Sequence, residues 1–119
     1  MIKSFIKVRT EFEGMHYYPN ASAIDQRIAF LESKHRHLFK VSVKIAVTHL
    51  DRELEFFLVK WALQDFITAN YNRAGSQSCE MIAMDILQHL LQSYGERFYE
   101  VVVSEDGESD GIIEYNPLT

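Results

Sequence analysis

The stretch FKVSVKIAV, residues 39–47, alternates apolar and polar side chains more regularly than any other part of the chain. Its apolar positions are all odd-numbered: Phe39, Val41, Val43, Ile45 and Val47. Because successive side chains of a strand point to opposite faces, this alternation predicts a strand with one face in the core. Most of these residues are β-branched, which also favours a strand. The chain is therefore expected to build its core on one face of a sheet.

Three further strands are expected around this one. Residues 2–12 have a period close to two, with apolar residues at Ile2, Ile6, Val8 and Phe12. Residues 97–106 and 110–115 also have strand composition, and the glycine-containing stretch 107–111 suits a tight connection between them. Residues 13–34 carry Gly, Pro, Asn and Ser at their front and predict a long loop with at most one turn of helix.

Two helices are predicted between the second and third strands. Residues 53–71 have apolar side chains at helical spacing, at Phe56, Val59, Leu63, Phe66 and Ile67. A second helix is expected after Ser78, a suitable N-cap, and before Gly95, a suitable stop. Its inward face would consist of Ile82, Ile86, Leu87, Leu90 and Leu91. The order strand, strand, helix, helix, strand, strand predicts an α+β fold with both helices on one face of an antiparallel sheet.

The composition limits the classes of function. With 119 residues, 47% of them hydrophobic, the chain is expected to form a single domain over residues 1–119. A net charge of -5 with scattered basic residues argues against a nucleic-acid partner. The first residues lack the features of a secretory signal, and no apolar run approaches the roughly 18 residues of a membrane span. A single cysteine, Cys79, makes a cytoplasmic setting the default expectation.

Histidines gather just before the clearest strand. His35 and His37 are two residues apart, so in a strand they point to the same face as Phe39. His16 follows the first strand and would lie beside them if the two strands pair as a hairpin. Three neutral histidines are a common ligand set for catalytic zinc. The alternative is a solvated basic patch that includes Lys34, Arg36 and Lys40, and spacing alone favours it.

Five short motifs follow one another along nearly the whole chain. They are FEGMH (12–16), HRHLFKVSVKIAV (35–47), EFFLVK (55–60), QSCEMIA (77–83) and VVVSE (101–105). In this order and spacing they resemble the family of 6-pyruvoyl-tetrahydropterin synthase and 6-carboxy-tetrahydropterin synthase, the latter an enzyme of queuosine biosynthesis.

The resemblance implies a T-fold, in which the sheets of several subunits close into a barrel. It implies a homo-hexamer of two trimers, with active sites at subunit contacts, which suits a small sheet with two open edges. It also implies zinc held by His16, His35 and His37, and a pterin ring anchored by the Glu105 carboxylate. Ser78 and Glu80, in the fourth motif, would contact the substrate, which in the family is dihydroneopterin triphosphate.

The chain departs from the family in its proton-transfer residues. Leu31 occupies the place of the usual cysteine, and Cys79 cannot replace it because it belongs to the helix motif. A branch of the family carries the pattern E-x-x-H-x-H instead, which ESKHRH matches, so Glu32 is the candidate general base. The family's Asp-His pair after the first helix is also missing, and Asn70 and Tyr71 lie nearest to its place.

These observations lead to one preferred function and two alternatives. The preferred function is a zinc-dependent lyase acting on dihydroneopterin triphosphate or a related pterin, with the queuosine, biopterin and folate outcomes all open. The first alternative is a zinc-containing homologue that binds a pterin or purine without turnover. The second is a structural oligomer in which the histidines are fortuitous.

Overall fold

The computed structural model describes residues 1–71 and 75–117, which form four strands, two α-helices and two short 3-10 helices. In chain order these are β1 (Ser4–His16), η1 (Ala21–Ala23), η2 (Gln26–Glu32), β2 (His35–Val47), α1 (Phe56–Asn70), α2 (Cys79–Tyr94), β3 (Tyr99–Glu105) and β4 (Ser109–Tyr115). The expected order of strands and helices is confirmed. In this part of the chain, no helix is both long enough and apolar enough to cross a membrane.

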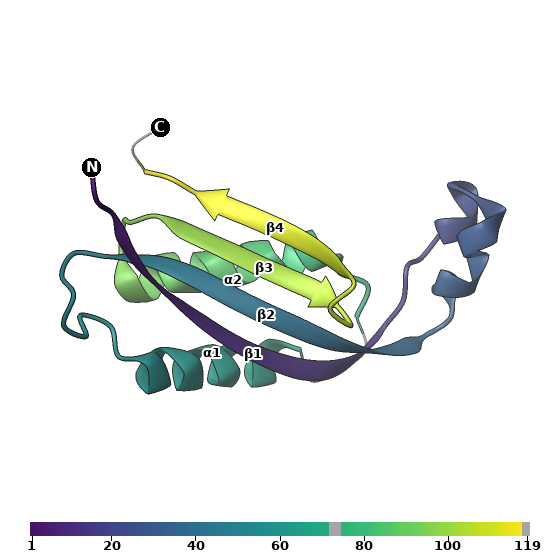
Figure 1. Ribbon diagram of the computed structural model, residues 1–119. Helices are drawn as coiled ribbons and strands as arrows, with labels where there is room; N and C mark the ends of the chain where they lie inside the picture. Colours follow the sequence, from purple (N-terminus) through teal and green to yellow (C-terminus); the bar gives the residue numbers. More distant parts are fainter. Residues whose placement is uncertain (72–74, 118–119) are drawn as a thin grey trace.

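The four strands form one antiparallel sheet in the order β1-β2-β3-β4 (Figure 1). β1 and β2 pair over their whole length, from Ser4 opposite Val47 to His16 opposite His35. β3 pairs with β2 only from Phe39 to Ile45. The β1–β2 hairpin therefore extends beyond the rest of the sheet, and η1 and η2 lie at its far tip (Figure 1).

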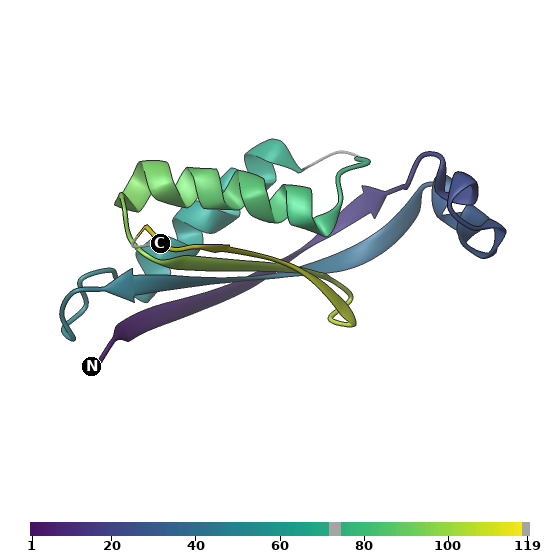
Figure 2. The same cartoon turned by 90° about the horizontal axis from the view of Figure 1, so that it is seen from above.

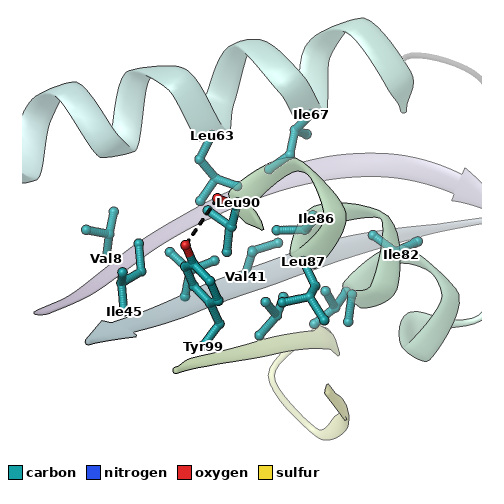
Figure 3. Close-up of a cluster of buried hydrophobic side chains, with 14 of the residues drawn as sticks. Val8, Val41, Ile45, Leu63, Ile67, Ile82, Ile86, Leu87, Leu90 and Tyr99 are labelled. Carbon is teal, nitrogen blue, oxygen red and sulfur yellow. Dashed lines mark hydrogen bonds between the residues drawn. The ribbon is translucent and has the colours of Figure 1, made fainter. Parts of the chain in front are cut away.

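Both helices cover the same face of the sheet (Figure 2). The odd-numbered side chains of β2 from Phe39 to Ile45 point into this interface and are at most 3% exposed, as their alternation predicted. Figure 3 shows the core between the layers. From the helices it receives Val59, Leu63, Ile67, Ile82, Ile86, Leu87 and Leu90.

Helix α2 begins and ends where the sequence predicted. The Ser78 hydroxyl accepts a hydrogen bond from the Met81 backbone N–H at 3.2 Å, which satisfies one of the free donors of the first turn. Gly95 ends the helix with a φ of 83°, a value that side chains disfavour. The N-terminus of α2 lies beside the histidines, since Ser78 and Glu80 line the same cavity as His16 and His35.

Four expectations about the core and the elements were wrong in detail. Ile2 is 96% exposed and Phe56 is 60% exposed, because β1 begins only at Ser4 and Phe56 is the first residue of α1. β1 continues to His16 because residues 13–16 pair with residues 35–38. The remainder of the expected loop contains η1 and η2, which is more helix than the single turn expected.

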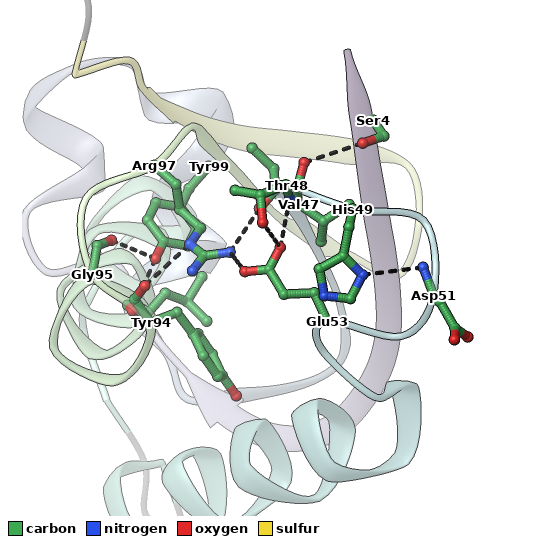
Figure 4. Close-up of polar contacts among 12 residues, drawn as sticks. Ser4, Val47, Thr48, His49, Asp51, Glu53, Tyr94, Gly95, Arg97 and Tyr99 are labelled. Carbon is green, nitrogen blue, oxygen red and sulfur yellow. Dashed lines mark hydrogen bonds and ion pairs between the residues drawn. The ribbon is translucent and has the colours of Figure 1, made fainter.

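A separate polar cluster is drawn in Figure 4. It adjoins the Val47 end of β2, whereas His35 lies at the other end of this strand. The Glu53 carboxylate accepts hydrogen bonds from Thr48 and pairs with Arg97 at 2.9 Å. Arg97 also donates to the Ala46 and Tyr94 carbonyl groups. The cluster therefore ties the β2–α1 connection to the turn between α2 and β3.

Candidate metal centre

The three histidines come together at the end of the β1–β2 hairpin. His16 is the last residue of β1 and lies directly opposite His35, the first residue of β2, so both side chains point to the helix-covered face. His37 points the same way, two residues further along β2. One ring nitrogen from each residue lies within 4.8 Å of the other two.

Each histidine uses one ring nitrogen for a hydrogen bond that fixes its orientation. Nε2 of His16 lies 2.7 Å from the Gln77 carbonyl oxygen, and Nδ1 of His35 lies 2.7 Å from that of Ser33. Nδ1 of His37 lies 2.7 Å from the Asp106 carboxylate. Because these partners only accept, the bonded nitrogen carries the proton in each ring, and the neutral ring keeps a lone pair on its other nitrogen.

Two of those other nitrogens are buried and unpaired. Within residues 1–71 and 75–117, the only buried side-chain nitrogen or oxygen atoms without a hydrogen-bond partner are Nδ1 of His16 and Nε2 of His37. The Glu105 carboxylate oxygens approach them to 3.9 and 3.4 Å. Lone pairs of neutral imidazoles and of a carboxylate repel one another unless a cation or added protons lie between them. The donor set therefore fits a divalent metal ion.

The centre has an apolar floor formed by Phe39. The Phe39 ring meets the rings of His16 and His37 edge-on, with centroid distances of 5.7 and 5.8 Å. The His16 and His37 side chains are only 12% and 16% exposed. Gly14, opposite His37, leaves room for this packing, since a Cβ there would approach the Phe39 ring to 3.2 Å. Restricted water access strengthens electrostatic interactions in the centre.

A cavity of about 450 Å³ opens beside the histidines. His16, His35 and Glu105 line it from the strands, and Ser78 and Glu80 line it from the first turn of α2. The structure thus brings together all of the residues predicted to bind metal or substrate. His37 belongs to the histidine cluster and contacts Glu105 but does not line the cavity. Their roles as ligands and substrate contacts stay predictions.

Cys79 is buried at the wall of this cavity. Its thiol lies 4.0 Å from Glu105 Oε1, within reach of a weak hydrogen bond from sulfur. Burial, together with the negative charges of Glu105, Glu80 and Asp110, raises the pKa of the Cys79 thiol to about 12. Cys79 is therefore a neutral thiol near pH 7 and not a thiolate nucleophile.

Glu32 lies apart from the cavity. Its carboxylate accepts hydrogen bonds from the Ser22 hydroxyl and backbone N–H at 2.6 and 2.9 Å, and these bonds lower the pKa of Glu32. Leu31, its neighbour, does line the cavity. Tyr71, near the place of the missing Asp-His pair, donates its hydroxyl to Asp85, and burial raises its pKa above the ordinary value for a phenol.

Sequence reasoning missed the residues that accept hydrogen bonds from the histidine rings and so orient them. Asp106 directly follows Glu105, and its backbone takes a left-handed conformation with a φ of 57°. This turn lets its carboxylate accept from both His37 and the Leu38 backbone N–H. The hydrogen bond from Leu38, followed by that from His37, lowers the pKa of Asp106. An aspartate beside the glutamate motif was visible in the sequence, but no pattern linked it to His37.

Comparison with known proteins supports a likeness of fold. No protein-family model and no curated protein matches the sequence. Among solved structures, 6-pyruvoyl tetrahydropterin synthase of Plasmodium falciparum matches with a TM-score of 0.71 and 14% identity, over 96% of this chain and 98% of that one. The apo form of the archaeosine synthase QueF-Like matches with a TM-score of 0.52 and 18% identity, over 95% and 96% of the two chains. This chain therefore has the T-fold of 6-pyruvoyl tetrahydropterin synthase, and the resemblance indicated by its motifs is confirmed at the level of the fold.

Proposed function

We propose that this chain is a zinc-dependent lyase of the tetrahydropterin synthase type, acting on dihydroneopterin triphosphate or a related pterin. Two buried nitrogen atoms carry the proposal, Nδ1 of His16 and Nε2 of His37, because they are unpaired and face a carboxylate. With His35 they form a ligand set that suits zinc. A zinc ion held there would supply Lewis-acid chemistry, lowering the pKa of a coordinated hydroxyl group.

Glu105 is the proposed anchor for the pterin ring. Its carboxylate lines the cavity and can accept two hydrogen bonds, from an amino group and a neighbouring ring N–H. Ser78 and Glu80 line the same cavity at the N-terminus of α2, which supports their assignment as further substrate contacts. A volume of about 450 Å³ is within the usual range for sites that bind small molecules.

Glu32 is the proposed general base, and it has to leave its present partner to act. The two hydrogen bonds from Ser22 stabilise the ionised carboxylate and make it a weaker base. A rotation of the side chain away from Ser22 would free the carboxylate and raise its basicity. The role therefore requires a change at the tip of the hairpin when substrate binds.

A binding protein without turnover is the second candidate. Leu31 presents an apolar side chain to the cavity where the family has a thiol. Cys79, with its raised pKa, is poorly suited to lose a proton near pH 7. Tyr71 is held by Asp85 and has a raised pKa as well. These observations favour a metal-containing protein that binds a pterin or purine and releases it unchanged.

The proposal includes a homo-hexamer in the cytoplasm. β1 and β4 are the edges of the sheet, and their free backbone groups can pair with another copy of the chain. In such an assembly, neighbouring subunits would be able to add residues to the cavity. Light scattering on the purified protein tests this assembly: a mass of six chains supports it, and a monomer contradicts it.

Product analysis separates the two candidate functions. The purified protein is loaded with zinc, incubated with dihydroneopterin triphosphate and analysed by mass spectrometry. A pterin product with released triphosphate supports the lyase, and the length of the remaining side chain identifies the outcome. If the protein holds zinc and returns the substrate intact, the lyase proposal is wrong and the binding protein is favoured.

Variants test the individual roles. Replacement of His37 by Ala is expected to abolish stoichiometric zinc binding, whereas the matched control His49→Ala, an exposed histidine outside the cluster, should retain it.

Glu105→Gln should weaken pterin binding because it loses one acceptor and the charge. If the protein turns over, Glu32→Gln should lower kcat, and unchanged turnover removes Glu32 from the mechanism.

A further inference from the structure

Asp85, on the second turn of α2, is linked to the metal centre through Gln77. Its Oδ2 atom accepts a hydrogen bond from the Gln77 side-chain amide at 3.0 Å and another from the Tyr71 hydroxyl at 2.8 Å. The backbone carbonyl of the same Gln77 accepts from His16 Nε2 at 2.7 Å. One residue thus connects the Asp85 carboxylate to a histidine ring.

The segment around Gln77 is fixed at both of its ends. Gly75 forms two backbone hydrogen bonds of 3.1 Å with the end of β1, from its own N–H to the Met15 carbonyl and from the Tyr17 N–H to its own carbonyl. Ser78 caps α2. Between these points, the Gln77 side chain donates to Asp85, which adds a further restraint on the segment that carries the Gln77 carbonyl.

The direction of that carbonyl decides which nitrogen of His16 can bind a metal ion. While the carbonyl accepts from Nε2, the proton stays on Nε2 and the buried Nδ1 keeps its lone pair toward the other two histidines. If the carbonyl turned away, Nε2 would lose its acceptor, and the ring could take the other tautomer or rotate. Partners that orient metal-binding histidines usually matter for affinity in this way.

We propose that Asp85 is a positioning residue for the metal centre, which acts through Gln77 to hold His16 in the tautomer that binds a divalent metal ion. This inference rests on the proposed metal site and assigns a role to a residue outside the ligand set and outside the cavity lining. Because Asp85 lies in the N-terminal half of α2 and Ser78 caps that helix, the inference makes α2 part of the support for the centre.

Metal affinity of four variants tests the proposal. Direct partners of metal-binding histidines typically contribute 10- to 100-fold to metal affinity. Asp85 acts on His16 through Gln77, so its loss is expected to lower the affinity by about 10-fold. Asp85→Ala and Gln77→Ala should each weaken Zn²⁺ binding by about this factor in competition with a chelator. Asp85→Asn keeps an acceptor oxygen and should recover most of the loss. Tyr71→Phe removes the other hydrogen bond to Asp85 without touching Gln77 and should stay within about twofold of the unmodified protein.

The visible absorption of the Co²⁺-loaded protein provides a second measurement that a general loss of stability would not change. Asp85→Ala and Gln77→Ala should shift the Co²⁺ bands in the same way, because both release the same carbonyl, and Tyr71→Phe should not. Circular dichroism confirms that each variant is folded. Unchanged affinity and spectrum in Asp85→Ala, or equal losses in Tyr71→Phe, overturn the inference. Absence of metal binding by the unmodified protein overturns the proposed function itself.

Discussion

Individual hydrogen bonds decide how the three histidine rings present their nitrogens. Asp106 shows this most directly, since its two carboxylate oxygens accept from the His37 ring and from the Leu38 backbone N–H. The first bond holds the proton on Nδ1 and leaves Nε2 for a metal ion. The second fixes the carboxylate itself.

Asp106→Asn is predicted to weaken zinc binding by about 10- to 100-fold, the usual cost of losing such a partner. Asparagine tolerates the left-handed backbone at this position, but its single oxygen replaces two acceptors and carries no charge. Competition with a chelator measures the change. Glu108→Gln, an exposed carboxylate in the same turn, is the control and should keep the original affinity. Equal affinities in the two variants would contradict a role for Asp106.

At the scale of the elements, β4 and the first turn of α2 meet without room for a side chain. A Cβ added at Gly111 would lie 2.7 Å from the Glu80 backbone nitrogen and 2.9 Å from the Cys79 Cβ. Both atoms belong to the turn that lines the cavity, so neither can move aside like the tip of a flexible side chain. The close approach of β4 therefore positions this wall of the site.

Gly111→Ala is predicted to destabilise the fold by about 1–3 kcal/mol, the range typical of overpacking. Chemical denaturation followed by circular dichroism gives the change in the free energy of unfolding. Gly75→Ala is the matched control, because a Cβ there meets nothing within 4 Å, and its effect should lie within about 0.5 kcal/mol. A Gly111→Ala protein as stable as this control would show that α2 and β4 separate easily.

Sequence patterns predicted the elements that depend on local rules. The alternation from Phe39 to Val47 predicted which side chains of β2 face the core. Ser78 and Gly95 marked the ends of α2, because helix caps depend on local backbone chemistry. The course of residues 17–34 was not predictable, since η1 and η2 have no periodic pattern and lie at the tip of a hairpin. The same limit applies to the site. His16, His35 and His37 could be grouped by strand pairing and family motifs, whereas Asp106 and Gln77 act through a turn and a backbone carbonyl.

At the scale of the whole molecule, the polar cluster around Glu53 and Arg97 makes the free energy of unfolding depend on pH. Hydrogen bonds from the Thr48 backbone, Arg97 and the Thr48 hydroxyl lower the pKa of Glu53 to about 2, from an ordinary value of 4.5. The folded protein therefore keeps this carboxylate ionised at pH values where the unfolded chain protonates it. Its stabilising effect is complete above about pH 4.5 and is lost as the pH falls toward 2.

Glu53→Gln is accordingly predicted to make the free energy of unfolding less dependent on pH below about pH 5. Between pH 5 and about pH 3, the unmodified protein should lose more free energy of unfolding than the variant, because the variant has no proton to take up at this position. Urea denaturation at several pH values measures both curves. Glu114→Gln, an exposed carboxylate on β4, serves as the control. Parallel curves for the unmodified protein and Glu53→Gln would contradict the assignment.

The pairing of β1 with β2 also makes the proposed zinc site a reporter of folding. His16 lies directly opposite His35, and a shift of the two strands by a single residue would turn His16 to the other face of the sheet. A misregistered hairpin could still bury apolar side chains and appear folded by circular dichroism, yet it could not bring three imidazoles to one ion. Zinc uptake during refolding would therefore mark the moment at which the two longest strands find their correct alignment.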